Sequence, residues 1–166
     1  MPTLIKLTDA AFAQVEDDFV HVTDEDDAPN VDAVILSFAR FQAEGEALLA
    51  AGRKVGVRLE SDQAVEDLAY DLPRLSVVAV AFPKFRDGRA FTSATLLRER
   101  FGYQGEVRAV GDVFREQAGF MVRCGFDAFE PSDGSTADEW GKAAGRFRHV
   151  YQRAADGRAP AFEERA

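Results

Sequence analysis

The chain contains a single cysteine, Cys124, and only two histidines among its 166 residues. One cysteine excludes an internal disulfide framework and any four-cysteine metal site within the chain. No apolar run approaches the roughly 18 residues that a membrane-spanning helix needs, because the longest, 77–82, has the length of a buried strand. The N-terminus lacks the basic segment, apolar stretch and small-residue cleavage site of a secretory signal. We therefore expect a protein of the reducing cytoplasm that does not enter a membrane.

Positive charge is also scarce, since the net charge is −9 and the pI is near 4.7. A nucleic-acid-binding domain normally carries a dominant basic face, so this class is not expected. The charge is unevenly spread: residues 1–50 hold eleven acidic and two basic side chains, whereas residues 84–123 hold eight basic and five acidic ones. Acidic surfaces keep proteins soluble, and a local arginine-rich region is suited to an anion or an acidic partner. Charge alone leaves both interpretations open.

Apolar runs alternate with helical patterns along most of the chain. Runs at 33–38, 55–59, 76–82, 107–110 and 126–129 are each followed by a helical pattern, and Thr136 and Glu139 form a capping box before the last one. About five β-α units in succession predict an α/β fold with a mainly parallel sheet. Two architectures fit, an open doubly wound sheet and a partial TIM-barrel-like curl. We expect one domain over 1–152, with an acidic lead-in (1–30) containing short strands at 4–7 and 19–22, and a loose tail over 153–166.

The loop after the third expected strand contains the turn pair Asp87-Gly88, followed by Arg89. Both candidate architectures place functional loops at the C-terminal ends of the strands. There the turn would present Asp87 and Arg89 beside the N-terminus of a helix that starts near Thr92 or Ser93, where backbone N–H groups attract anions. The alternative is an Asp–Arg pair that only stabilises the loop, with Ser93 capping the helix.

Arg108 lies within the fourth expected strand and is followed by Gly111 and Asp112. A guanidinium buried in a strand requires an acidic partner, for which Asp87 and Asp112 are candidates. Asp112 is also expected to cap the next helix, and Gly111 permits a close backbone approach. Gln117 falls in the apolar stripe of that helix, so its amide must bond either a neighbouring backbone carbonyl or a ligand.

Motifs for a cofactor are missing. The chain has no glycine-rich dinucleotide motif, no phosphate-binding loop and no nucleophile elbow, so we predict no cofactor. Cys124 is expected to end a helix, where the dipole disfavours a thiolate, and a packing role is predicted for it. The histidines, His21 and His149, lie far apart in the sequence, and no metal site is predicted from them.

The stretch 85–129 resembles one bacterial family, the domain-of-unknown-function 934 family. The resemblance rests on Asp87-Gly88-Arg89, Leu97-Arg98, Gly102-Tyr103-x-Gly105-Glu106, Arg108-Ala109-x-Gly111-Asp112, Gln117 and Arg123-Cys124-Gly125-Phe126-Asp127. Glu116 stands where the family pattern has Asp. Members are usually described as oxidoreductases or accessory proteins of sulfite reduction, which implies a role in sulfate assimilation with sulfite reductase as the partner. With one cysteine the chain cannot hold the iron–sulfur cluster of such a reductase itself.

The leading hypothesis is therefore an accessory protein of assimilatory sulfite reduction. It would bind the reductase or an anionic ligand at a site of Asp87, Arg89 and Arg108, supported by Ser93, Arg98, Gly111, Asp112 and Gln117. A stand-alone enzyme, oxidoreductase-like and acting on a small sulfur-containing or phosphorylated anion, would use Asp87 as its acid–base group. A structural scaffold is the third hypothesis. Trp140 and Tyr151, on the last expected helix, would either pack inward or form a homodimer surface.

Overall fold

The computed structural model describes residues 3–25 and 30–165, and within them eight strands form one sheet in the order β2-β1-β8-β7-β6-β5-β4-β3. Strands β3 to β8 are parallel and follow chain order, whereas β1 is antiparallel to both β8 and β2. The strands are β1 (Leu4–Thr8), β2 (Ala11–Val15), β3 (Val20–Val22), β4 (Ala33–Ser37), β5 (Lys54–Leu59), β6 (Val77–Phe82), β7 (Glu106–Gly111) and β8 (Ala128–Phe129).

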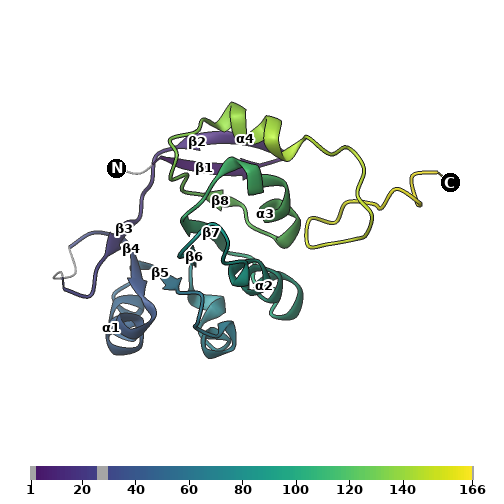
Figure 1. Cartoon of the computed structure of the whole chain (residues 1–166). Coiled ribbons are helices and arrows are strands. Elements are labelled where there is room, and N and C mark those ends of the chain that lie inside the picture. Colours follow the sequence, from purple (N-terminus) through teal and green to yellow (C-terminus); the bar gives the residue numbers. More distant parts are fainter. Residues whose placement is uncertain (1–2, 26–29, 166) are drawn as a thin grey trace.

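The helices cover the convex face of the sheet (Figure 1). Two begin at side-chain caps: Ser37 Oγ accepts from the backbone of Arg40, and Thr136 forms the predicted capping box with Glu139. No helix among the described residues is both long and apolar enough to cross a membrane. The helices are α1 (Phe38–Ala50), α2 (Arg89–Thr95), α3 (Ala118–Cys124) and α4 (Ala137–Ala144), with 3-10 turns η1 (Val65–Leu68), η2 (Leu72–Arg74) and η4 (Arg115–Gln117) and a π-helical turn η3 (Leu96–Arg100) that continues α2.

The sheet is curled into a half-barrel, and the length of one linker shows how far. Strands β2 and β3 are the two edges of the sheet, yet only residues 16–19 join them. Eight strands laid flat would separate these edges by about 34 Å, whereas five residue steps reach at most about 18 Å. The sheet must therefore curl until its edges approach each other. Figure 1 shows the linker 16–19 running across the open side of the curl from the β1–β2 hairpin to β3.

Both faces of the parallel strands are buried. Alternate residues of β6, such as Val78 and Val80, face the helices in the main core, while Val77, Ala79 and Ala81 point into the curl. Inside the curl, Phe19 of the linker packs against a small cluster that also includes Ile35 and Val110. Burial on both faces explains why β6 is apolar at every position.

The structure confirms an α/β fold and corrects its details. The sheet is mixed rather than mainly parallel, and it has eight strands because β1 and β2 add an antiparallel hairpin beside β8. The doubly wound alternative is wrong, since β3 to β8 follow chain order without a reversal. The strands expected at 4–7 and 19–22 do not pair with each other. The helical pattern that follows the apolar run 55–59 predicts a helix over about 63–72, but the structure has the turns η1 and η2 there.

The two ends of the chain differ in how they join the body. The acidic lead-in supplies the three strands β1, β2 and β3. Residues 1–2 and 26–29 of this lead-in, and residue 166 at the other end of the chain, lie outside the described residues. After α4, residues 146–165 contain no helix or strand. Arg123 of α3 holds this segment through an ion pair to Asp156 at 2.6 Å and a hydrogen bond to the backbone oxygen of Gln152. Tyr151 therefore lies beyond the last helix and not on it.

Candidate functional site

Arg108, at the middle of β7, points into the curl and is the largest polar side chain that is fully buried, with 0% of its surface exposed. Its guanidinium donates to Asp17 Oδ2 at 2.7 Å and Oδ1 at 3.1 Å, to Glu130 Oε1 at 2.9 Å and to Glu106 Oε1 at 2.6 Å. The linker 16–19 brings Asp17, β7 brings Glu106, and the end of β8 brings Glu130. Residues 91 positions apart thus meet because the linker closes the curl.

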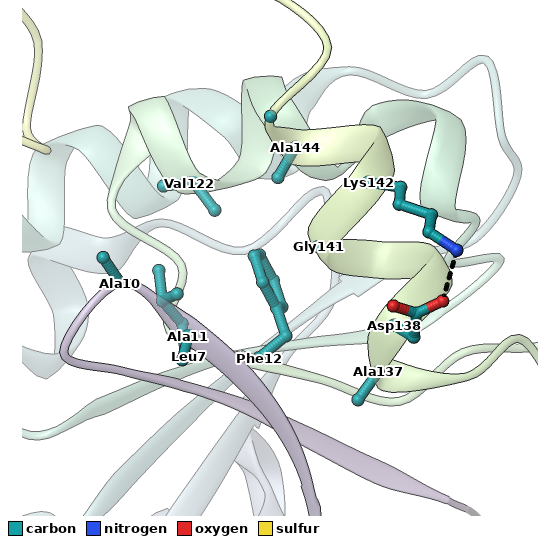
Figure 2. Close-up of a pocket in the computed structure, with 11 residues that line it drawn as sticks. Leu7, Ala10, Ala11, Phe12, Val122, Ala137, Asp138, Gly141, Lys142 and Ala144 are labelled. Carbon is teal, nitrogen blue, oxygen red and sulfur yellow. Dashed lines mark ion pairs between the residues drawn. The ribbon is translucent and has the colours of Figure 1, made fainter.

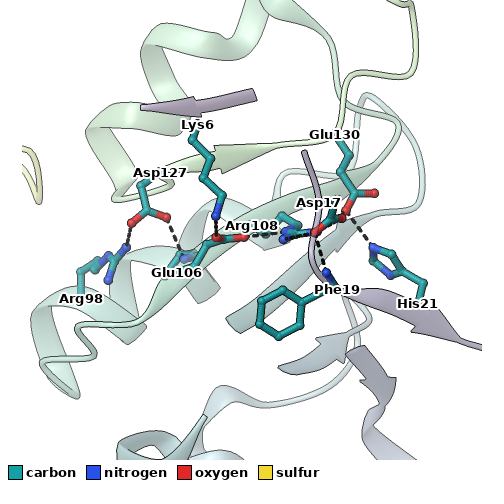
Figure 3. Close-up of polar contacts among 10 residues, drawn as sticks. Lys6, Asp17, Phe19, His21, Arg98, Glu106, Arg108, Asp127 and Glu130 are labelled. Carbon is teal, nitrogen blue, oxygen red and sulfur yellow. Dashed lines mark hydrogen bonds and ion pairs between the residues drawn. The ribbon is translucent and has the colours of Figure 1, made fainter. Parts of the chain in front are cut away.

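Three more side chains extend this cluster (Figure 3). Lys6 of β1 pairs with Glu106 at 2.6 Å, and His21 Nε2 of β3 lies 2.8 Å from Glu130 Oε1. The ring of Phe19 lies 5.8 Å from the Arg108 guanidinium carbon, within cation–π range. We refer to the charged members as the Arg108 network: Lys6, Asp17, His21, Glu106, Arg108 and Glu130.

Hydrogen bonds and charge within the network favour the ionised forms of Asp17 and Glu130. Burial opposes ionisation of Asp17 and of Glu130, but hydrogen bonds from Arg108 to both, and from His21 to Glu130, outweigh it. The pKa of each carboxyl group consequently lies below its ordinary value. Burial likewise opposes the charge on Arg108, yet the surrounding carboxylates raise its pKa above the ordinary value. Arg108 is therefore a permanent buried cation that orients the acidic groups.

A pocket of about 380 Å³ opens beside this network, a volume within the range of small-ligand sites. It is formed by the linker, β3 and the C-terminal ends of β5, β7 and β8, the edge where half-barrels of this kind carry function. His21 and Arg58 offer polar groups to it, with side chains 29% and 41% exposed. The strand-end pocket is lined by Asp17, Phe19, Val20, His21, Arg58, Val110, Gly111 and Glu130.

The chemistry of the strand-end pocket centres on His21 and Arg58. The carboxylate of Glu130 fixes one ring nitrogen of His21, which is the arrangement that orients a histidine for proton transfer. The Nε of Arg58 bonds Glu60 at 2.7 Å, and its two terminal nitrogens form no hydrogen bond with the described residues. Asp17, His21 and Glu130 also offer ligand atoms within 4.8 Å of one another, so they could hold a metal ion.

A second hollow, of about 520 Å³, lies between the β1–β2 hairpin and α4 (Figure 2). Small apolar side chains such as Ala10, Ala11 and Ala137 line much of it, together with the ring of Phe12. Its charged side chains, Asp138 and Lys142, pair with each other at 2.6 Å on the surface of α4. It therefore lacks the oriented polar groups of the strand-end pocket.

The sequence-predicted site is split by the fold. Asp87 and Arg89 lie at the surface and pair with each other at 2.6 Å, and the side chain of Ser61 after β5 also bonds Asp87. Hydrogen bonds from Arg89 hold the pKa of Asp87 well below its ordinary value, so Asp87 stays a carboxylate. The expected pairing of Arg108 with Asp87 or Asp112 is wrong, because Arg108 points into the curl and finds its partners there.

Asp112 and Gln117 hold the loop that carries Asp87. Asp112 Oδ2 accepts from the backbone of Phe85 at 3.2 Å, and Gln117 Nε2 donates to the carbonyl of Phe85 at 3.2 Å. Of the two partners expected for the Gln117 amide, a backbone carbonyl or a ligand, the structure shows the backbone carbonyl. Asp112 does not cap a helix, because α3 begins at Ala118 after the turn η4.

The remaining predicted residues support the backbone. Gly111 has φ +91°, and a Cβ there would lie 2.4 Å from the carbonyl oxygen of Phe82. The guanidinium of Arg98 donates to the carbonyls of Tyr103, Gly105 and Gly125 and pairs with Asp127 at 2.8 Å. Ser93 lies within α2 rather than at its start, since Gly88 precedes the helix. Of these residues, Gly111 alone lines the strand-end pocket.

Sequence reasoning missed Asp17, Glu130 and Arg58, and it set His21 aside. Asp17 and His21 belong to the acidic lead-in, whose place in the sheet follows from the antiparallel pairing of β1 with β8 and the parallel pairing of β3 with β4. Arg58 and Glu130 did carry a signal, because each is a charged residue at or just after the end of an apolar run. Reading every expected strand end in the same way would have found both.

The fold and the pocket define an α/β half-barrel domain with a candidate small-ligand site at its strand ends. The family model of a bacterial protein of unknown function, DUF934, matches residues 56–162, and the chain belongs to this family. The comparison with curated proteins returns no match. Arg58, Arg108 and Glu130 lie inside the matched range, whereas Asp17 and His21 lie before it.

Proposed function

We propose that the protein binds a small molecule bearing an oxyanion group in the strand-end pocket, as an accessory component of sulfite reduction. The association with sulfite reduction rests on the resemblance of residues 85–129 alone. The observation that carries the ligand class is the position of Arg58, which lines the strand-end pocket and whose terminal nitrogens are free of hydrogen bonds to described residues. A guanidinium with two free nitrogens suits an oxyanion because it can donate to two oxygens at once.

The pocket volume narrows the ligand further. About 380 Å³ exceeds what a single sulfite or phosphate ion fills, and it suits a small organic molecule with a sulfonate or phosphate group. Val20, Val110 and the ring of Phe19 would contact the apolar part of such a molecule. His21 would lie between the apolar part of the ligand and the Glu130 carboxylate. From there its imidazole can donate a hydrogen bond to the ligand or exchange a proton with the ligand.

Titration calorimetry with sulfite, sulfate, phosphate and small organic sulfonates and phosphate esters tests this proposal. Arg58→Gln should weaken binding about 10–100-fold, which corresponds to the loss of one hydrogen-bonded charge contact. Arg86→Gln is the matched control, because Arg86 is an exposed arginine outside the pocket. Equal affinity for Arg58→Gln and wild type, or no binding of any organic anion, would overturn the pocket assignment.

If the bound molecule is also converted, the geometry favours His21 over Asp87 as the acid–base group. Asp87 is held ionised by Arg89 and lies outside the pocket, so it is poorly placed to give up a proton. His21→Gln should then abolish turnover while Asp87→Asn leaves it unchanged. The opposite result would return the acid–base role to Asp87.

A second candidate function, docking on the reductase, is favoured by an exposed surface formed by α3 and the segment after α4. Phe120, Phe147 and Tyr151 are 68%, 69% and 92% exposed, and Arg146 and Arg148 form no ion pair with the described residues. Exposed aromatic rings and arginines are enriched at protein interfaces. Two unpaired arginines on a chain of net charge −9 favour an acidic surface of the partner and disfavour a second copy of this patch.

Biolayer interferometry with purified sulfite reductase tests the docking surface. Tyr151→Ala with Phe147→Ala should abolish binding, and Tyr70→Ala is the matched control, since Tyr70 is 86% exposed and lies outside this surface. Binding that survives the double change, or that is lost equally in the control, would reject this surface as the contact.

A further inference from the structure

We propose that Asp17, His21 and Glu130 bind a divalent first-row transition-metal ion at the wall of the strand-end pocket. The inference rests on the pocket being the functional site, and it deepens that proposal by naming what would hold an oxyanion there. The three side chains come from the linker, β3 and the residue after β8, so the closed curl brings them together.

The geometry of the three groups is close to that of a coordination sphere. Their ligand atoms lie within 4.8 Å of one another, and His21 Nε2 is already 2.8 Å from Glu130 Oε1. Metal–nitrogen and metal–oxygen bonds of about 2.0–2.2 Å place ligand atoms on opposite sides of an ion about 4.0–4.4 Å apart and tetrahedral neighbours about 3.4 Å apart. The side chains must therefore close in by up to about 1.4 Å to surround an ion.

Free coordinating oxygen is present at the site. Glu130 uses Oε1 for its bonds to His21 and Arg108, while its other oxygen, Oε2, forms no hydrogen bond with the described residues. All three side chains line the pocket, so an ion bound by them would keep open positions facing it. This matches the pattern of catalytic and ligand-binding metal sites, in which three protein ligands leave room for water or substrate.

The Arg108 network contains more carboxylates than permanent cations. Its three carboxylates exceed its two permanent cations, Lys6 and Arg108, by one. A metal ion held by Asp17, His21 and Glu130 would supply positive charge beside them. Imidazole with two carboxylates is a ligand set used for Mn²⁺, Fe²⁺ and Zn²⁺, and the pocket-facing position gives such an ion access.

Arg108 would act as a positioning residue for this site. Its guanidinium holds both oxygens of Asp17 and one of Glu130, as outer-shell groups do for metal-bound carboxylates. The remaining charge of Arg108 is shared with Glu106, which bonds its Nε at 2.6 Å. That contact lowers the repulsion between the guanidinium and an ion on the far side of the carboxylates.

The experiment is a calorimetric titration of chelator-treated protein with Zn²⁺, in the absence of any anion and with millimolar Mg²⁺ present. Wild type should bind one Zn²⁺, and Co²⁺ should give a visible d–d spectrum. His21→Gln and Glu130→Gln should each lose at least about tenfold in affinity. The chain has only one other histidine, so His149→Gln, in the C-terminal segment, is the matched control and should bind as wild type does.

Each outcome bears on one proposal separately. No Zn²⁺ binding by wild type, or equal binding by His21→Gln, overturns the metal site. Oxyanion binding by the chelator-treated protein would then show that the pocket proposal stands without the metal. If Zn²⁺ binding depends on His21, the metal site is supported. If in addition no anion binds with or without Zn²⁺, the proposed oxyanion ligand is wrong.

Discussion

Replacing the buried arginine of β7 by glutamine, Arg108→Gln, is expected to destabilise the fold severely. Arg108 makes four hydrogen bonds to three carboxylates, and glutamine can donate only two without carrying charge. Removing one partner of a buried ion pair costs about 3–5 kcal/mol, because the remaining charges stay buried without compensation. In a protein of this size each kcal/mol lowers the melting temperature by about 2–4 °C, so a fall of roughly 6–20 °C is expected.

The stability lost in Arg108→Gln should also depend on pH, and it should be larger at pH 7 than in acid. In the wild type, Asp17 and Glu130 have folded-state pKa values below their ordinary ones, so their contribution to stability is present above about pH 4.5 and is lost as the pH falls through the folded values. In Arg108→Gln these carboxylates repel one another, and protonation relieves the repulsion. The difference in stability between the two proteins should therefore narrow from pH 7 towards pH 4.

Thermal denaturation followed by far-UV circular dichroism at pH 7 and pH 4.5 measures both effects. Arg86→Gln serves as the control, because an exposed arginine of the strand-end loop should change stability by less than about 0.5 kcal/mol. A melting temperature of Arg108→Gln within 2–3 °C of the wild type, or a difference that widens in acid, would refute the assignment of Arg108 as the permanent cation of the curl.

Three further results are expected. Gly111→Ala should lower the free energy of unfolding by about 1–3 kcal/mol because of its φ of +91°, and by more because of the contact with Phe82. Gly134→Ala, with φ +69° and open space around it, should lose only the conformational contribution, and urea midpoints of the two variants test this. Burial raises the pKa of the Cys124 thiol, so iodoacetamide should modify it more slowly at pH 8 than in the urea-unfolded chain, and equal rates would contradict this. Trp140→Phe removes an indole N–H that donates to a buried seryl hydroxyl at 2.8 Å, and should cost about 1 kcal/mol by thermal denaturation, with no loss if that bond is unimportant.

The parallel part of the sheet could be predicted because its signals are local. An apolar run such as 77–82, followed by a loop and a helix, indicates a buried strand without knowledge of the rest of the chain. The hairpin β1–β2 could not, because its place depends on pairing with β8 some 120 residues later. The prediction of a helix near 63–72 was wrong for a different reason. Pro73 and the short spacing to β6 favour the turns η1 and η2 over a continuous helix.

The candidate site could be predicted only in part, for the same physical reason. The burial of Arg108 follows from its position in a strand, and its need for acidic partners follows from the cost of an unpaired buried charge. The choice of partner does not follow, because Asp17 reaches it across the curl from 91 residues away. Asp87 and Arg89 are close in sequence and look like a site, yet they pair with each other at the surface.

The pairing of β1 with β8 has a consequence for synthesis on the ribosome. Lys6 finds its partner Ala128 only after about 120 further residues are made, which takes roughly 6–25 s at ordinary translation rates. During that time Leu4 and Ile5, fully buried in the finished protein, belong to a strand that can pair with β2 but lacks its other neighbour, β8. Short strands and a central lysine limit the pairing of such an edge with other chains. Strand β1 can therefore complete its pairing only after β8, the last strand of the sheet in chain order, has been translated.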